Sequence, residues 1–168
     1  LGEDLGKDAI KNIGKLSQMF GDADQMGLKK AMLSVGSAVN EVAQNSSAAE
    51  PYLVDFTARL AGVGNQANMS VSQIMGFASV LDQNMQQVEM SSTALQGVIM
   101  KMFKDPAKLA SIAGLEVKSF TELVEKDANE ALLQLLETLG KVGGMNKLAP
   151  IFDEMKLDGA RAASVLSV

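Results

Sequence analysis

The chain contains no cysteine and no histidine. Without cysteine it has neither disulfide bonds nor thiolate chemistry. Without histidine it lacks the usual general base, the commonest metal ligand and the side chain that titrates near neutral pH. Any catalysis would have to rest on carboxylate, lysine, tyrosine or hydroxyl groups alone. These two absences argue against an enzyme, and we expect no catalytic, cofactor-binding or metal-binding residues.

Aromatic residues are also scarce, at 4% of the chain, and tryptophan is absent, whereas methionine occurs 11 times. Strands favour β-branched and aromatic residues, while flexible methionine fills irregular gaps between packed helices. Apolar residues recur at helical spacing through almost the whole sequence, which predicts an irregular array of helical hairpins with about eight or nine helices. The predicted fold class is therefore all-α with no significant sheet, and any strand is confined to residues 115–117.

Positive charge is not concentrated anywhere in the sequence. The formal net charge is −5, and the nearest approach to a basic stripe, Lys101, Lys104 and Lys108, is interrupted by Asp105 and Pro106. Surfaces that bind nucleic acid concentrate lysine and arginine. We therefore interpret this stripe as a solvated helix face and expect no direct nucleic-acid binding.

Residues 60–81 carry no charge and have the length of a membrane span. Seven polar side chains within them are too many for the hydrocarbon core of a bilayer, so we expect two packed helices and their connection. The N-terminal sequence LGEDLGKD has neither the basic segment nor the apolar run of a signal peptide. The polar residues of the uncharged segment are Asn65, Gln66, Asn68, Ser70, Ser72, Gln73 and Ser79.

Apolar residues spaced three and four apart predict the buried face of each helix. The cleanest of these faces belongs to the late helix that contains Leu135. The predicted core residues are Ala9, Ile13, Leu16 and Phe20; Leu28, Met32, Val35, Val39 and Val42; Leu53, Phe56, Leu60 and Val63; Ile74, Ala78, Leu81 and Met85; Leu95, Val98, Ile99, Met102 and Phe103; and Leu132, Leu135, Leu136 and Leu139.

Capping residues predict where the helices begin and end. Ser and Asp accept hydrogen bonds from the first free backbone amides, proline suits a first turn, and glycine stops a helix. The predicted starts are Asp22 or Asp24, Pro51, Ser70 with Gln73, Asp105 before Pro106, Ser119 with Glu122, Asp127 with Glu130, and Asp158; the predicted stops are Gly21, Gly114 and Gly143-Gly144.

Three glycines, Gly36, Gly76 and Gly97, lie inside helical patterns. Each costs about 1 kcal/mol relative to alanine in a helix interior. Their presence indicates either a close approach of two helices or a hinge, and we favour the close approach because small residues lie nearby.

Two short motifs imitate known binding sites. GVGNQA at residues 62–67 satisfies a dinucleotide-binding pattern, but that site needs a preceding strand and DFTARLA has helical character. Asp22, Asp24 and Gly27 have the spacing of a calcium loop, but its twelfth position is Leu33 instead of a carboxylate. Neither motif predicts a site.

The segment from Ala67 to Leu115 contains two apolar-periodic helices around a polar hinge, DQNMQQVEMSST at residues 82–93, followed by a short helix that begins with proline and stops at glycine. DANEALLQLLETLGKV at 127–142 and LAPIFDEMKLDGARAASVLSV at 148–168 follow in order. Over residues 60–168 this succession resembles the core region of the tail tape measure proteins of long-tailed phages and prophages.

The resemblance implies a structural, non-enzymatic virion protein that sets tail length, nucleates tail-tube assembly and leaves the tube at DNA ejection. It implies self-association, with the tube, assembly chaperone and baseplate proteins as partners. It also implies a location in the virion tail and, during assembly, in the bacterial host cytoplasm.

We expect residues 1–168 to form a single helical domain, with candidate internal boundaries near 44–50 and 143–144. The sequence starts without methionine and stops within a helical pattern, so we also expect it to be a fragment of a longer protein.

Two alternative functions remain. One is a generic helical scaffold or coiled-coil interaction domain, which the Ala, Gln, Ser and Asn residues of 39–49 would suit. The other is an α-helical cell-wall hydrolase, since paired carboxylates cleave glycosides. Its candidate acids are Glu122, Glu125, Asp127 and Glu130, with Asp153 and Glu154. Most of these acids lie near predicted helix N-termini, where negative charge is favoured without any catalysis.

Overall fold

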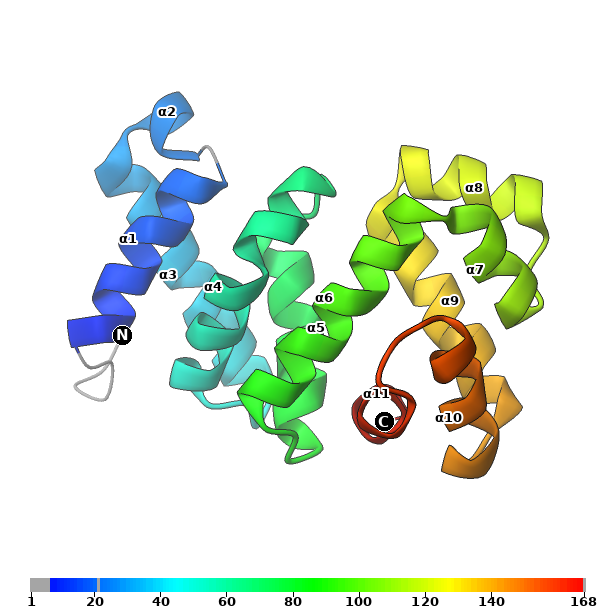
Figure 1. Cartoon of the computed structure of the whole chain (residues 1–168). Coiled ribbons are helices and arrows are strands. Elements are labelled where there is room, and N and C mark those ends of the chain that lie inside the picture. Colours follow the sequence, from blue (N-terminus) through cyan, green and yellow to red (C-terminus); the bar gives the residue numbers. More distant parts are fainter. Residues whose placement is uncertain (1–6, 21, 168) are drawn as a thin grey trace. The chain divides into compact units, whose positions relative to one another are not determined.

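In the computed structural model, which describes residues 7–20 and 22–167, the chain is all-α, and no strand occurs among these residues. Figure 1 shows the helices in chain order. They are α1 (Lys7–Met19), α2 (Asp22–Met26), α3 (Leu28–Asn45), α4 (Glu50–Gln66), α5 (Val71–Gln83), α6 (Val88–Lys104), α7 (Pro106–Ala113), α8 (Val117–Lys126), α9 (Ala128–Val142), α10 (Met145–Glu154) and α11 (Gly159–Leu166).

The described residues thus contain 11 helices, and the predicted number of eight or nine was too low. The five-residue helix α2 has no apolar stripe of its own and was read as the start of α3. Gly27 separates the two helices because its φ of 82° is a conformation that a helix cannot continue through.

The contacts divide the chain into two compact units, residues 1–89 and 90–168. The boundary falls inside the polar hinge at 82–93, in which the non-helical residues 84–87 join α5 to α6. The prediction of a single domain stays a prediction.

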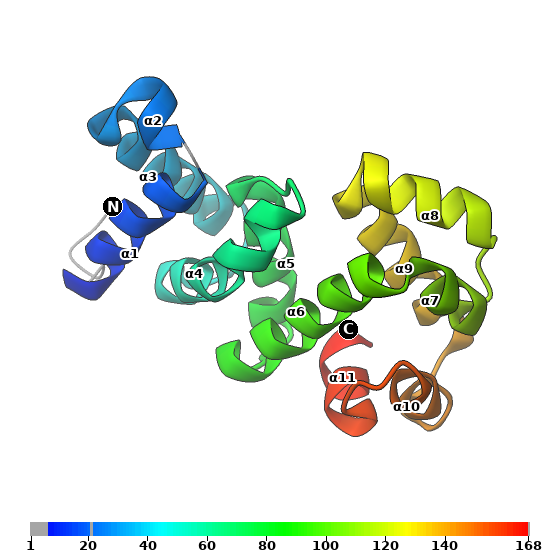
Figure 2. The same ribbon diagram turned by 45° about the horizontal axis from the view of Figure 1, so that its top comes forward.

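In the first unit, α4 packs against α1, α3 and α5, and α1 packs against α3. Leu53, Phe56 and Leu60 of α4 are completely buried. Burying a side chain of this size contributes about 1.5–3 kcal/mol. Figure 2 shows α4 between its neighbours from a second direction.

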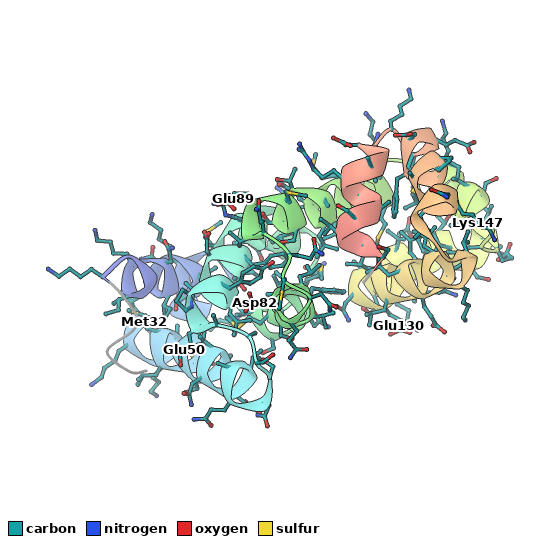
Figure 3. The ribbon with its side chains drawn as sticks, turned by 90° about the horizontal axis from the view of Figure 1, so that it is seen from below. Met32, Glu50, Asp82, Glu89, Glu130 and Lys147 are labelled. Atoms are coloured by element: carbon teal, nitrogen blue, oxygen red, sulfur yellow. The ribbon has the colours of Figure 1, made fainter. Side chains whose placement is uncertain are left out.

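Three side-chain hydrogen bonds connect α4 to distant parts of this unit. The Asn65 amide donates to the carbonyl oxygen of Met19 at the end of α1, over 2.7 Å. The Asp82 carboxylate accepts from the backbone N–H of Ala49, also over 2.7 Å. Arg59 donates to Glu89 over 3.1 Å. Asp82, in the last turn of α5, and Glu89, in the first turn of α6, are both labelled in Figure 3.

The connection at 44–50, a candidate domain boundary, forms several hydrogen bonds with the residues around it. The Ser46 hydroxyl donates to the Val42 carbonyl over 2.7 Å and accepts from the Ala48 N–H over 3.2 Å. Ala48 is buried, and Ala49 donates to Asp82 of α5. These contacts bind the segment to the unit on both of its sides.

In the second unit, α9 packs against α7, α8 and α10, while α10 packs closely against α11. Leu132, Leu135 and Leu139 form the inner face of α9 and are buried, whereas Leu136 is only half-buried. The predicted helical phase is therefore right, with Leu136 at the margin of the buried face.

Most of the predicted core is buried. Leu28, Met85 and Phe103 are exceptions, with exposed fractions of 45%, 94% and 45%. The buried members are Ile13, Leu16, Val35, Val39, Leu53, Phe56, Leu60, Ile74, Ala78, Leu81, Leu95, Val98, Ile99, Met102, Leu132, Leu135 and Leu139, and the half-buried ones are Phe20, Met32, Val42, Val63 and Leu136. The side chain of Ala9 lies outside the described residues.

The three exposed residues have local explanations. Leu28 is the first residue of α3, beyond the contacts that cover the rest of its stripe. Met85 follows the end of α5 and has a left-handed φ of 57°. Phe103 lies about 100° around the helix from Met102, which occupies the centre of the buried face of α6.

Several predicted helix starts are confirmed. Ser70 and Gln73 form both hydrogen bonds of a capping box. The side chains of Asp105, Asp127 and Asp158 each accept from the backbone amide three residues ahead. Pro51 lies in the first turn of α4, and Gly114 ends α7 with a φ of 75°.

Two predicted starts are wrong. Helix α8 begins after Glu116, whose carboxylate accepts from the amides of Lys118 and Ser119, so Ser119 lies inside the helix. Helix α3 begins after Gly27, which makes no side-chain cap, so the predicted start of this helix at Asp22 or Asp24 is wrong. The predicted stop at Gly21 lies outside the described residues.

The interior glycines do not share one role. A Cβ atom added at Gly97 would lie 2.9 Å from the Leu157 side chain, which confirms a close approach there. A Cβ atom at Gly76 would meet nothing within 4 Å, so close approach is wrong at that position. Gly64 of α4, by contrast, faces the buried side chain of Ile74 in α5.

Among the described glycines of the second unit, the tightest surroundings are those of Gly159, the first residue of α11. A Cβ atom there would overlap the carbonyl oxygen of Ala149 and the carboxylate of Asp153. The same Asp153 oxygen accepts from the Gly159 N–H over 2.9 Å. The backbone of α11 can approach α10 closely enough for this hydrogen bond only because residue 159 is glycine.

We predict that Gly159→Ala lowers the free energy of unfolding by about 1–3 kcal/mol, the usual cost of overpacking a filled site. Gly76→Ala is the matched control, because it gains up to about 1 kcal/mol of helix propensity in open space. Urea denaturation monitored by circular dichroism measures both variants. Equal stability of the two would contradict the α10–α11 contact.

Truncating a leucine side chain on the buried face of α9 should affect stability more than truncating one on its exposed face. Leu135→Ala is expected to cost about 2–5 kcal/mol because the buried side chain leaves a cavity. Leu133→Ala, on the exposed face of the same helix, should change stability by less than about 0.5 kcal/mol. Thermal unfolding of both variants tests the orientation, and a larger loss for Leu133→Ala would show that the helix is turned the other way.

Candidate functional site

The acids that suggested a hydrolase have structural roles in several cases. Asp127 caps α9 through the Glu130 amide, over 3.0 Å. Asp153 holds the start of α11 through Gly159. Glu122 lies 4.0 Å from Lys118 of the same helix, with both side chains largely exposed. These contacts account for the three acids without a reaction, whereas Glu125 and Glu130 are exposed on α8 and α9.

Buried polar groups in the described residues are satisfied locally. Ser17 donates to the Ile13 carbonyl over 2.8 Å, and Thr57 donates to the Leu53 carbonyl over 2.7 Å. No buried side-chain nitrogen or oxygen atom in the described part of the chain lacks a hydrogen-bond partner. Unpaired buried groups are costly and often mark functional sites, and these residues contain no such mark.

The dinucleotide-like motif lies mostly within a helix. Gly62 and Gly64 of GVGNQA lie within α4, so no strand precedes a phosphate-binding turn. Asn65, three residues of the α4–α5 connection and the first two residues of α5 line a cavity of about 360 Å³ together with Phe20 and residues of α3. No lysine, arginine, aspartate or glutamate lines this cavity, which makes it a poor site for charged ligands.

A second cavity, of about 200 Å³, lies within the second unit between the C-terminal half of α6, helix α7 and the end of α10. Its charged lining is mainly basic, and its apolar lining consists of Leu109, Ile112 and Met155. We call it the lysine pocket. Its charged residues are Lys101, Lys104, Lys108 and Lys156, with Asp105 and Glu154.

Helix C-termini account for three of the four lysines, whereas Lys108 lies in the first turn of α7. Lys101 and Lys104 belong to the last turn of α6, and Lys156 follows the last turn of α10. The carbonyl groups at a helix C-terminus favour cations. Asp105 caps α7 by accepting from the Lys108 amide over 3.1 Å. The sequence showed three of these lysines, and the fold adds the fourth from far along the chain.

The apolar stripe of α3 is largely used within its own unit. Val35 and Val39 are completely covered, while Leu28 at its beginning remains exposed. Met26 and Leu33, with exposed fractions of 42% and 62%, lie on either side of Leu28 in the sequence. The exposed apolar residues near this stripe are therefore Met26 at the end of α2 and Leu28 and Leu33 of α3.

A comparison with known proteins identifies the family of the chain. A family model described as a phage-related minor tail protein matches residues 4–156. The chain belongs to the phage-related minor tail protein family. No curated protein and no solved structure matches it.

In this minor tail protein, the described residues contain no cluster of three or more His, Cys, Asp or Glu side chains that could hold a metal ion. None of the described helices combines the length and apolar character needed to cross a membrane. The absence of catalytic, cofactor-binding and metal-binding residues stays a prediction.

In this minor tail protein, Glu116 caps the start of α8. Its carboxylate accepts from the Ser119 and Lys118 amides over 2.6 and 3.1 Å. Hydrogen bonding to Ser119 lowers the pKa of Glu116 below the ordinary glutamate value, with the Lys118 amide contributing further. A carboxyl group with a lowered pKa stabilises the fold above its ordinary pKa, and this contribution is lost as the pH falls through the lowered value.

We therefore predict that Glu116→Ala lowers the melting temperature at pH 7, and that this difference shrinks in acid as the wild-type carboxylate becomes protonated. Glu125→Ala, an exposed acid on the same helix, is the control. Thermal unfolding between pH 7 and pH 2 measures both variants. A difference for Glu116→Ala that is constant with pH would show that the carboxylate does not cap α8.

Proposed function

We propose that this chain is part of a tail tape measure protein, which takes part in tail-length determination and tail-tube assembly through helix-mediated contacts. The observation that carries the proposal is the match of residues 4–156 to the phage-related minor tail protein family. The all-α structure and the ordered succession of helices over 60–168 support the finer assignment.

The proposed location is the virion tail and, during assembly, the bacterial host cytoplasm. The proposed partners are further copies of the chain and the tube, assembly chaperone and baseplate proteins. The exposed apolar residues Met26 of α2 and Leu28 and Leu33 of α3 support a role in such contacts, because partner proteins bury exposed apolar surface.

The structure favours a module attached to a ruler over a piece of the ruler itself. A helix advances about 1.5 Å per residue, so an extended helical rod converts residue number into length. The longest described helix, α3, has 18 residues, and within each unit the helices fold back on one another. We infer that this region contributes assembly contacts and not tube length.

We further propose that the region acts without catalysis. The missing histidine and cysteine, and the use of Asp127 and Asp153 in helix caps and helix contacts, support this view. A peptidoglycan-cleavage assay on the purified chain addresses the hydrolase alternative directly, and cleavage lost on Glu125→Gln or Glu130→Gln would refute the proposal.

In-frame deletion of residues 1–168 from the full protein is expected to block tail formation, because assembly contacts would be lost. The control is Gly76→Ala in the full protein, which changes an exposed helical position and should give normal tails. Electron microscopy of lysates measures tail number and length. Intact tails shortened by about 250 Å, the rod length of the deleted residues, would show instead that the region is part of the ruler.

A further inference from the structure

The lysine pocket combines positive charge with an apolar lining. Lys101 is half-buried, and Lys104, Lys108 and Lys156 are exposed around it. None of the four has a carboxylate oxygen within 4.0 Å among the ion pairs of the described residues, whereas Lys118, Lys141 and Arg161 of the same unit each pair with a nearby acid. Among the described residues, the lysines of the pocket therefore form no ion pair within 4.0 Å, although Asp105 and Glu154 also line it.

This combination fits a carboxylate carried beside an apolar side chain. The ammonium groups can bind carboxylate oxygens, and Leu109, Ile112 and Met155 can contact carbon atoms between them. A nucleic-acid duplex is a poorer fit, because it presents phosphates along the whole length of both strands. The pocket is a single cavity of about 200 Å³. The chemistry thus favours an acidic protein surface.

The outer face of α9 on the same chain has the complementary character. Leu133 is 45% exposed there, although Leu132 and Leu135 beside it are completely buried. Glu130 and Glu137 lie three residues before and four residues after Leu133, so all three share one helical face. Glu130 is marked in Figure 3, and Glu137 pairs with Lys141 over 2.8 Å. One exposed leucine between two acids matches an apolar lining surrounded by lysines.

The two surfaces are separate on one chain. No residue of α9 lines the lysine pocket, and the inner face of α9 is the one that packs into the unit. One copy can therefore offer its pocket to one neighbour and its α9 face to another. A contact between two different surfaces repeats from copy to copy and forms a ring or a filament.

We propose that the lysine pocket of one copy binds the outer face of α9 of a second copy, with Leu133 on the apolar lining and Glu130 and Glu137 among the lysines. The contact extends the proposed assembly role by naming the surfaces through which copies associate. Like any contact between exposed charges, it weakens as the salt concentration rises.

A charge-swap experiment on the purified 168-residue chain tests this contact. The pocket variant is Lys104→Glu/Lys108→Glu, and the face variant is Glu130→Lys/Glu137→Lys. Sedimentation velocity at low salt measures self-association as a function of concentration. Each variant alone should associate at least about tenfold more weakly than the wild type, since like charges then meet across the contact. An equimolar mixture of the two should recover association, because opposite charges meet again at both kinds of contact.

The matched control for the pocket variant is Lys29→Glu/Lys30→Glu, which makes the same change of net charge at exposed positions of α3. It should associate like the wild type. Circular dichroism checks that every variant keeps its helical content and melting temperature. Leu133→Gln, which keeps all charges, should also weaken association if the leucine is part of the contact.

Several results would overturn the proposal. They are a wild-type chain that stays monomeric at low salt up to millimolar concentration, a folded pocket variant that associates normally, and a mixture that does not recover. Binding of duplex DNA that is lost in the pocket variant, with self-association unchanged, would assign the pocket to nucleic acid instead. Failure of the charge swap while deletion of the region still blocks tails would remove this contact and leave the assembly role intact.

Discussion

The burial of one complete face of α4 is the constraint on which the first unit depends. Leu53, Phe56 and Leu60 have no exposed surface, and α1, α3 and α5 each owe part of their packing to this helix. Apolar burial is not directional, so it brings the helices together without fixing their ends. The hydrogen bond between Asp82 and the chain before α4, and the one between Asn65 and the end of α1, fix the positions of these ends.

Among the described residues of the second unit, fewer hydrogen bonds between side chains and distant backbone groups accompany the apolar burial. Its central helix α9 is buried through leucines, and the hydrogen bond between Asp153 and Gly159 joins the last two helices. That bond depends on backbone approach, which only glycine permits at this position. In the first unit, the positions of the helix ends are therefore fixed by side-chain hydrogen bonds. In the second unit, they are fixed by a close backbone approach at a residue without a side chain.

The sequence predicted those features that depend on neighbours along the chain. The capping box of Ser70 with Gln73 and the aspartate cap before Pro106 are local, so their spacing was sufficient. Glu116 was missed because glutamate is an uncommon N-cap and Ser119 offered the more familiar pattern. Phe103 was assigned to the core because periodicity gives a helix its faces but not the width of the surface that its neighbours cover.

The candidate site was predictable only in part, for a related reason. Lys101, Lys104 and Lys108 were visible as a stripe, and a solvated face was the natural reading of it. Lys156 and Met155 reach the same cavity through the packing of α10, which no local spacing reveals. Likewise, the exposure of Leu133 became notable only when the rest of the α9 stripe was found to be covered.

The methionines differ sharply in their access to solvent, and this difference has a consequence for oxidation. Met85 is 94% exposed in the connection between α5 and α6, whereas Met75 and Met102 are completely covered, one in each unit. Conversion of a thioether to a sulfoxide requires access to the sulfur. An oxidant will therefore modify Met85 in the folded chain and reach Met75 or Met102 only when the corresponding unit opens. Oxidation of Met75 therefore reports opening of the first unit, and oxidation of Met102 reports opening of the second.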